Sequence, residues 1–151
     1  MLRIGTAQYF ASLKQFLEHL PVGKDDELLI LKGHLLIERL LERFHAQNLT
    51  QASRLAEAKL TFAQKLAIAS ALRDNSGDDW LWEAITALNR LRNELVHQLP
   101  NPRFEDLRTA FLTLVENSPE LPELEPPSDI HDRLHRAIFS IHEAMSHRVD
   151  L

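Results

Sequence analysis

Apolar residues recur every three to four positions along most of this chain, and that spacing constrains its fold more than any other feature. The stretch from about Glu27 to Asn48 shows it best, because its apolar residues return to one side of a helix at each turn. Its main set is Leu29, Leu36, Ile37, Leu40, Leu41 and Phe44, and a second set, Leu28, Leu31 and Leu35, widens the stripe. A surface helix does not need so wide an apolar stripe. We therefore expect burial on two sides, between neighbours in a bundle or against another subunit.

The same spacing predicts further helices before and after this one. They cover about residues 2–20, 61–72, 78–99, 102–116 and 129–148. The segment 49–60 is polar and rich in alanine, and it can be a loop or a short helix. Residues 117–128 (NSPELPELEPPS) carry four of the seven prolines and three glutamates, which predicts an extended, semi-rigid connector.

Polar residues and prolines mark where these helices begin and end. Asp25 or Asp26 can cap the helix that starts near Glu27. Thr61 and Gln64 have the spacing of a capping box, in which each side chain binds a backbone N–H group of the other residue. Asn101 can cap the helix in which Pro102 occupies the first turn. Pro21 and Gly23 end the first predicted helix, and the run Asn75-Ser76-Gly77 ends the helix that begins near Thr61.

With only 4 glycines in 151 residues and few β-branched runs, nothing favours a sheet. The predicted fold class is all-α, an antiparallel helical bundle of five to six helices. We expect a single helical domain over residues 1–151, with a core bundle at about 27–116, the connector at 117–128 and a C-terminal helix at 129–148.

Composition narrows the setting and the function class. There is no cysteine, which excludes disulfides and thiolate metal sites and favours a reducing compartment. No apolar run reaches the length of a membrane span, and residues 1–8 lack the pattern of a signal peptide, so we expect a cytoplasmic protein with no membrane partner. The formal charge of −5 weakens any case for general nucleic-acid binding but leaves room for a local basic site.

The phrase Leu91-Arg92-Asn93-Glu94-Leu95-Val96-His97 holds the candidate chemistry. It resembles the motif of HEPN-domain proteins, in which an arginine, often followed by asparagine, precedes a histidine by a few residues. The family is all-α, and many members are metal-independent endoribonucleases, including toxins of toxin–antitoxin pairs. The mannitol-repressor-like bundles have a comparable phrase without established nuclease activity. The resemblance covers about Glu27 to Glu116. It implies a site completed at a two-fold dimer interface and an RNA substrate.

The residue types also suit this chemistry without the family. Cleaving RNA through its 2′-hydroxyl needs a proton carrier near neutral pH, which histidine provides, and fixed positive charge on the phosphate, which a guanidinium provides. On a continuous helix Asn93 and His97 share a face, whereas Arg92 lies about 140° around the axis from His97. Either the Arg92 side chain wraps around, or the helix ends before Pro100, or two copies complete each other's site.

Two earlier carboxylates are supporting candidates. HEPN proteins often bring an acidic residue toward the motif, and Glu38 or Glu42 can do so by pairing with Arg92. In the ordinary alternative, Arg92 is an ion-pair partner of Glu94, Glu38 or Glu42, and His97 is a polar residue at a helix end. His34, four residues before Glu38, is then expected as its surface partner.

The C-terminal helix holds four histidines, His131, His135, His142 and His147, of which the first three share one face. A His-x3-His pair can contribute to a zinc site only with a third ligand in reach, so a solvated stripe is the expected arrangement. Searches for a phosphate loop, a nucleophile elbow and a metalloprotease motif find none in the sequence. We therefore predict no cofactor and no metal.

The sequence thus supports two functional hypotheses. The first is a homodimeric, HEPN-like, metal-independent endoribonuclease with catalytic Arg92, Asn93 and His97, acting as a toxin or in defence and controlled by an antitoxin or another regulatory protein. The second is a non-catalytic helical regulatory or interaction module, similar to the mannitol-repressor-like proteins, in which Arg92 and His97 are structural.

Overall fold

The computed structural model describes residues 25–72, 77, 79–97, 101–121 and 125–149. This part of the chain contains six helices and no strand, which confirms the all-α fold class and the helical bundle. The predicted helix at 2–20, with Pro21 and Gly23 after it, lies outside the described residues, as do Asn75 and Ser76. The helices are α2 (Asp26–Asn48), α3 (Ser53–Glu57), α4 (Phe62–Ala71), α5 (Asp79–Glu94), α6 (Pro102–Glu116) and α7 (Ile130–Val149).

The helix starts follow the capping residues that the sequence indicates. Asp25, rather than Asp26, caps α2, and its carboxylate accepts a hydrogen bond from the Leu28 backbone N–H at 3.0 Å. Thr61 and Gln64 form the predicted capping box of α4, with both reciprocal hydrogen bonds present. Asn101 caps α6 by accepting from the Arg103 N–H at 3.0 Å, after which Pro102 occupies the first turn. Local side-chain chemistry therefore sets these three boundaries.

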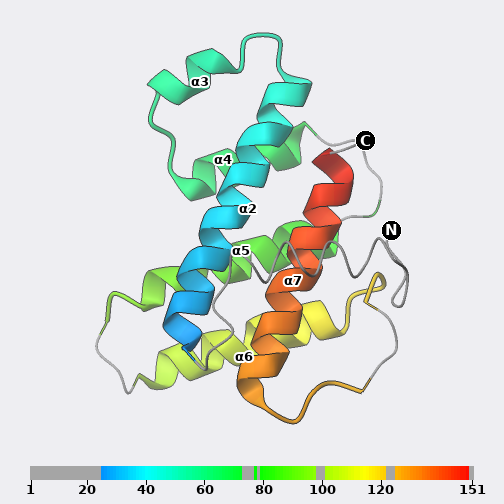
Figure 1. The fold of residues 1–151 in the computed structure, drawn as a ribbon. Helices are drawn as coiled ribbons and strands as arrows, with labels where there is room; N and C mark the ends of the chain where they lie inside the picture. Colours follow the sequence, from blue (N-terminus) through cyan, green and yellow to red (C-terminus); the bar gives the residue numbers. More distant parts are fainter. Residues whose placement is uncertain (1–24, 73–76, 78, 98–100, 122–124, 150–151) are drawn as a thin grey trace.

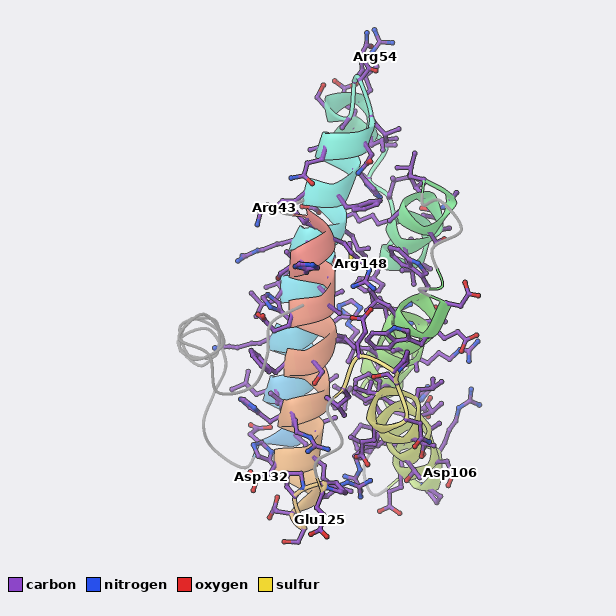
Figure 2. All side chains as sticks on the ribbon, turned by 90° about the vertical axis from the view of Figure 1, so that its right-hand side faces the viewer. Arg43, Arg54, Asp106, Glu125, Asp132 and Arg148 are labelled. Atoms are coloured by element: carbon purple, nitrogen blue, oxygen red, sulfur yellow. The ribbon has the colours of Figure 1, made fainter. Side chains whose placement is uncertain are left out.

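The helices form two layers that cross each other. In Figure 1, α2 and α7 run side by side from bottom to top, in front of α5 and α6, which run crosswise behind them. Figure 2 shows the same layers from the side, with α4, α5 and α6 on the right. The pair α5 and α6 is antiparallel, as the short connection between them requires.

The pair α2 and α7 is parallel, which the prediction of an antiparallel bundle did not include. Asp26 at the start of α2 contacts His131 at the start of α7. About two turns further along both helices, Gly33 contacts Ile138. Both contacts join residues that are 105 positions apart, so the two helices keep one register. A parallel pair is possible here because the whole α3–α6 region returns the chain to the starting end.

The approach of α2 to α7 depends on a glycine. A Cβ added at Gly33 would lie 2.6 Å from the Cγ2 of Ile138, closer than two carbon atoms can approach. Around this contact lies one core that all the helices except the short α3 supply. Its fully buried larger side chains are Phe111, Leu29, Ile30, Ile37, Leu41, Leu81, Ile85, Leu88, Leu91, Leu112, Leu134 and Ile138.

Charged groups fasten both ends of α7. At its start, the Nδ1 of buried His131 lies 2.6 Å from the Asp26 carboxylate, which Arg108 of α6 also approaches at 3.5 Å. At its far end, Arg148 pairs with Glu120 at 2.7 Å. These pairs are partly or largely buried, so removing one partner costs more than for a surface ion pair. None of the helices in the described part of the chain is long and apolar enough to cross a membrane.

Candidate functional site

The end of α5 differs from the continuous helix to Leu99 that the sequence pattern suggested. The α-helix ends at Glu94, and the next three residues form tighter hydrogen bonds, from Leu95 N to Arg92 O at 3.2 Å and from His97 N to Glu94 O at 3.1 Å. These are i→i+3 bonds of the 3₁₀ type. The early helix end is one of the three arrangements considered for the motif. The shared face of Asn93 and His97, which assumed a regular helix, therefore no longer follows.

Contacts from the start of α6 hold this end of α5 in place. The Glu94 carboxylate accepts a hydrogen bond from the Asn101 amide at 2.9 Å, and it lies 3.3 Å from Nε of Arg103. Glu94 is buried, so these contacts satisfy a charge that water does not reach well. Asn101 thus has two roles, because its oxygen caps α6 while its nitrogen holds Glu94. Glu94 is therefore a partner of α6 and not the expected partner of Arg92.

The three predicted catalytic residues lie together on the surface at this helix end. Arg92, Asn93 and His97 are all exposed. The guanidinium of Arg92 donates to the Asn93 carboxamide oxygen at 3.3 Å. Asn93 therefore orients the guanidinium of Arg92. The arrangement can present a guanidinium and an imidazole to a ligand from adjoining turns of the chain.

The predicted supporting carboxylates have a different partner. Lys65 of α4 lies between Glu38 and Glu42, with its ammonium 2.9 Å from the first carboxylate and 2.7 Å from the second. Burial alone would lower the pKa of Lys65, but its hydrogen bonds to Glu42 and Glu38 outweigh that effect and raise the pKa. The expectation that Glu38 or Glu42 pairs with Arg92 is thus replaced by an α2–α4 contact. Lys65, which the sequence did not single out, organises this part of the interface.

His34 is a buried contact between layers and not a surface partner of Glu38, so that expectation is wrong. Its Nε2 lies 2.9 Å from the Asn89 carboxamide oxygen on α5, and its ring stacks on Phe62 of α4 at 3.9 Å between centroids. Since the carboxamide oxygen can only accept, Nε2 donates. Burial lowers the pKa of His34, the hydrogen bond to Asn89 opposes this, and the positive charge of Arg92 adds to the lowering. The neutral imidazole is therefore the form that the folded chain prefers.

Exposed apolar side chains lie on the half of α2 that carries His34. Leu28, Leu31 and Leu35 are 36%, 44% and 47% exposed, and Val96 within the motif is 77% exposed. His34 contacts α5 one turn before Arg92, so this half of α2 and the end of α5 are neighbours. In a single chain, the wide apolar stripe predicted for this helix is therefore only partly buried.

A groove opens on the outer face of the second layer, between α4, α5 and α6. Its volume is about 590 Å³ and its lining is mostly apolar. The groove is not visible in the sequence, because it results from small residues on two helices that only the fold brings together. It is lined by Ala63, Leu66, Ala67, Ser70, Trp82, Glu83, Thr86, Ala87, Asn89, Arg90, Leu107, Ala110 and Leu114.

The histidines of α7 do not form the solvated stripe that was expected. His131 is buried against Asp26, and burial lowers the pKa of His135, with a smaller contribution from the charge of His131. In the described ranges, no group of three or more histidine, aspartate or glutamate side chains is placed to hold a metal ion.

Comparisons with known proteins leave the motif as the basis for any family assignment. No family model, no curated protein and no solved structure matches this chain.

Proposed function

We propose that this chain is an HEPN-like, metal-independent endoribonuclease that cleaves RNA at the surface formed by Arg92, Asn93 and His97. The observation that carries the proposal is the end of α5, where these three side chains are exposed together and Asn93 orients the Arg92 guanidinium. An imidazole can move the proton of the 2′-hydroxyl, and a guanidinium can stabilise charge on the phosphate oxygens. In the turn after α5 the His97 N–H donates to the Glu94 carbonyl oxygen, so His97 stays at the same helix end as Arg92 and Asn93, which supports this role.

We further propose that the active form is a homodimer with two such surfaces side by side. The exposed Leu28, Leu31 and Leu35 of α2 and the exposed Val96 of the motif support a second copy at this place, because apolar side chains gain free energy when they leave water. Two copies would also double the local positive charge of Arg92 in a chain whose net charge is −5. An antitoxin or another regulatory protein would control such an enzyme by covering the same surface.

The test is cleavage of end-labelled single-stranded RNA by purified protein in the presence of EDTA. The expected products carry cyclic-phosphate ends, and cleavage falls strongly in Arg92→Ala and His97→Ala. His147→Ala, which changes an exposed histidine at the end of α7, is the matched control and should cleave like the wild type. Cleavage that is unchanged in His97→Ala, or that EDTA abolishes, overturns the mechanism.

The dimer has its own test. Leu31→Glu and Leu35→Glu place a charge on the exposed stripe, and they should shift the sedimenting species from dimer to monomer and reduce cleavage together. A wild-type protein that sediments as a monomer at all concentrations while it cleaves RNA contradicts the dimer but not the chemistry.

A second candidate function is a non-catalytic regulatory or interaction module, similar to the mannitol-repressor-like proteins. The observation that favours it is the amount of exposed apolar surface, in the α2 stripe and in the groove, which suits a protein partner. This candidate predicts no RNA cleavage at any protein concentration. Arg92 and His97 are exposed, so under this second candidate function they would belong to a binding surface rather than stabilise the fold.

A further inference from the structure

The groove between α4, α5 and α6 is a surface that the proposed chemistry at Arg92 and His97 does not use. Ala63 and Ala67 of α4 and Ala110 of α6 line it together with residues of α5. Alanine side chains leave open a space that longer side chains would fill, so the groove results from residue choice at these positions. With about 590 Å³, it falls within the size range of small-ligand sites.

The carboxamide of Asn89, which lines this groove, is oriented by a hydrogen bond from His34. The oxygen of Asn89 accepts the hydrogen bond from Nε2 of His34 at 2.9 Å, which leaves the NH₂ group of Asn89 to donate. His34 is itself buried and stacked on Phe62, so it cannot turn away easily. An amide donor oriented by a buried, packed histidine is the kind of preorganised group that recognises a carbonyl oxygen.

The groove has a negative charge at Glu83 and a positive charge at Arg90, so the charge of its lining changes along α5. Among the α5 residues that line the groove, Arg90 follows Glu83 by two turns, about 10 Å along the helix axis. Asn93, which orients Arg92, follows Asn89 by one turn, on nearly the same side of α5. A ligand with negative phosphates would therefore place them toward Arg90 and the motif, and away from Glu83.

We propose that this groove binds a base of single-stranded nucleic acid, next to the phosphate that the motif acts on. The apolar walls would hold the faces of the base, Trp82 would contribute aromatic contact, and the amide of Asn89 would donate to a base carbonyl oxygen. Arg90 would neutralise the adjoining phosphate. The proposal rests on the proposed function and deepens it, because it assigns the RNA a path along α5 to Arg92.

An amphipathic helix of a protein partner is the competing occupant, since such helices lie in apolar grooves. An apolar helix face offers neither an acceptor for the Asn89 amide donor nor a negative charge for the neighbouring Arg90. The pair His34 and Asn89, with Arg90 beside it, thus favours a ligand that offers a carbonyl oxygen and a phosphate.

The experiment measures binding of a probe that cannot be cleaved, a short single-stranded 2′-O-methyl RNA of mixed sequence. The chain has two tryptophans, and Trp80→Phe leaves only Trp82. Contact with a base should quench the fluorescence of Trp82. In that background Ala67→Leu, which fills the groove from α4, should weaken binding about tenfold or more. Ala71→Leu is the matched control, because Ala71 is an exposed alanine of the same helix outside the groove lining, and it should bind as the background does. Ala110→Leu repeats the test from α6.

The outcomes separate this inference from the proposed function. Equal binding by Ala67→Leu, Ala110→Leu and the control overturns the groove as a base site, even if cleavage still depends on His97. Groove-dependent binding without any cleavage supports the base site and overturns the ribonuclease. If the RNA causes no quenching while Ala67→Leu abolishes binding of a leucine-rich amphipathic peptide, the occupant is a protein and the inference is wrong.

Discussion

The Nε2 atom of His34 lies 2.9 Å from the carboxamide oxygen of Asn89, and this contact joins α2 to α5 one turn before Arg92. It connects the buried polar residues between the two helix layers with the surface that carries the candidate chemistry. A charged imidazole in this place is poorly solvated and lies close enough to Arg92 to be repelled, so protonation of His34 destabilises the fold around this contact.

The first prediction concerns pH. Burial lowers the pKa of His34 below its ordinary value of 6.5, so at mildly acidic pH the unfolded chain binds more protons than the folded one. The corresponding stability is present above that ordinary value and is lost as the pH falls below it. The urea midpoint should therefore decrease from about pH 7.5 to about pH 5, and it should decrease less in His34→Gln, which keeps a donor for Asn89.

His135 contributes with the same sign, because burial lowers its pKa too, so the double variant His34→Gln, His135→Gln should show the smallest decrease. His97→Gln, at an exposed histidine, is the control and should keep the wild-type decrease. A pH dependence that is identical in all four proteins contradicts the assignment to buried histidines.

The second prediction separates chemistry from stability at the motif. Arg92→Ala, Asn93→Ala and His97→Ala remove exposed side chains, so each should change the free energy of unfolding by no more than about 0.5 kcal/mol. Under the proposed function, His97→Ala should slow cleavage about 10²–10⁴-fold and Arg92→Ala about 10²–10³-fold. Urea unfolding and single-turnover cleavage of the same preparations provide both quantities. A variant that loses activity and several kcal/mol of stability together would point to a structural role.

The third prediction compares two helix caps. Asn101→Ala and Thr61→Ala each remove a capping oxygen, at a cost of about 1 kcal/mol in the free energy of unfolding. Asn101→Ala also frees the buried Glu94 carboxylate, so it should cost more than Thr61→Ala and should slow RNA cleavage by loosening the end of α5. Thr61→Ala should leave the cleavage rate unchanged. Equal rates in the two variants would show that the contact between Glu94 and Asn101 does not position the motif.

The fourth prediction tests the close contact between α2 and α7. Gly33→Val forces new carbon atoms against Ile138, and such overpacking costs about 1–3 kcal/mol. The thermal midpoint should fall by about 2–4 °C for each kcal/mol. Ala46→Val, at an exposed position of the same helix, should have a small effect. Adding Ile138→Ala to Gly33→Val should give a double variant less unstable than the sum of the single changes, and a fully additive result would contradict the contact.

Local features of the fold could be predicted from the sequence because they depend on neighbouring residues. The capping box of Thr61 and Gln64 and the cap at Asn101 are determined within four residues, and both are found where the pattern placed them. The end of α5 was predicted several residues too late. The apolar pattern continues through Leu95 and Val96, whereas the α-helix ends at Glu94, whose carboxylate contacts Asn101 and Arg103 at the start of α6.

Partners distant in sequence were the part that could not be predicted. His34 and Glu38 have the spacing of a surface pair on a helix, yet their partners are Asn89, 55 residues later, and Lys65, 27 residues later. Nothing in the sequence around His34 indicates which helix will cover it. The groove has the same origin, since Ala67 of α4 and Ala110 of α6 line one groove only because the fold brings their helices together.

The constant separation of 105 residues between α2 and α7 also has a consequence for how the chain acquires its structure. Contacts between residues so far apart form slowly, since a long loop must close before they contribute, whereas α5 and α6 follow each other closely in the sequence. On the ribosome, α2 can pack on α4 and α5 once they are made, but its face toward α7, which includes Gly33, stays uncovered until α7 has emerged. Pulse-labelled hydrogen exchange during refolding should accordingly find amide protection in α5 and α6 before α2 and α7. The first of the described helices to be synthesised thus completes its packing only when the last one arrives.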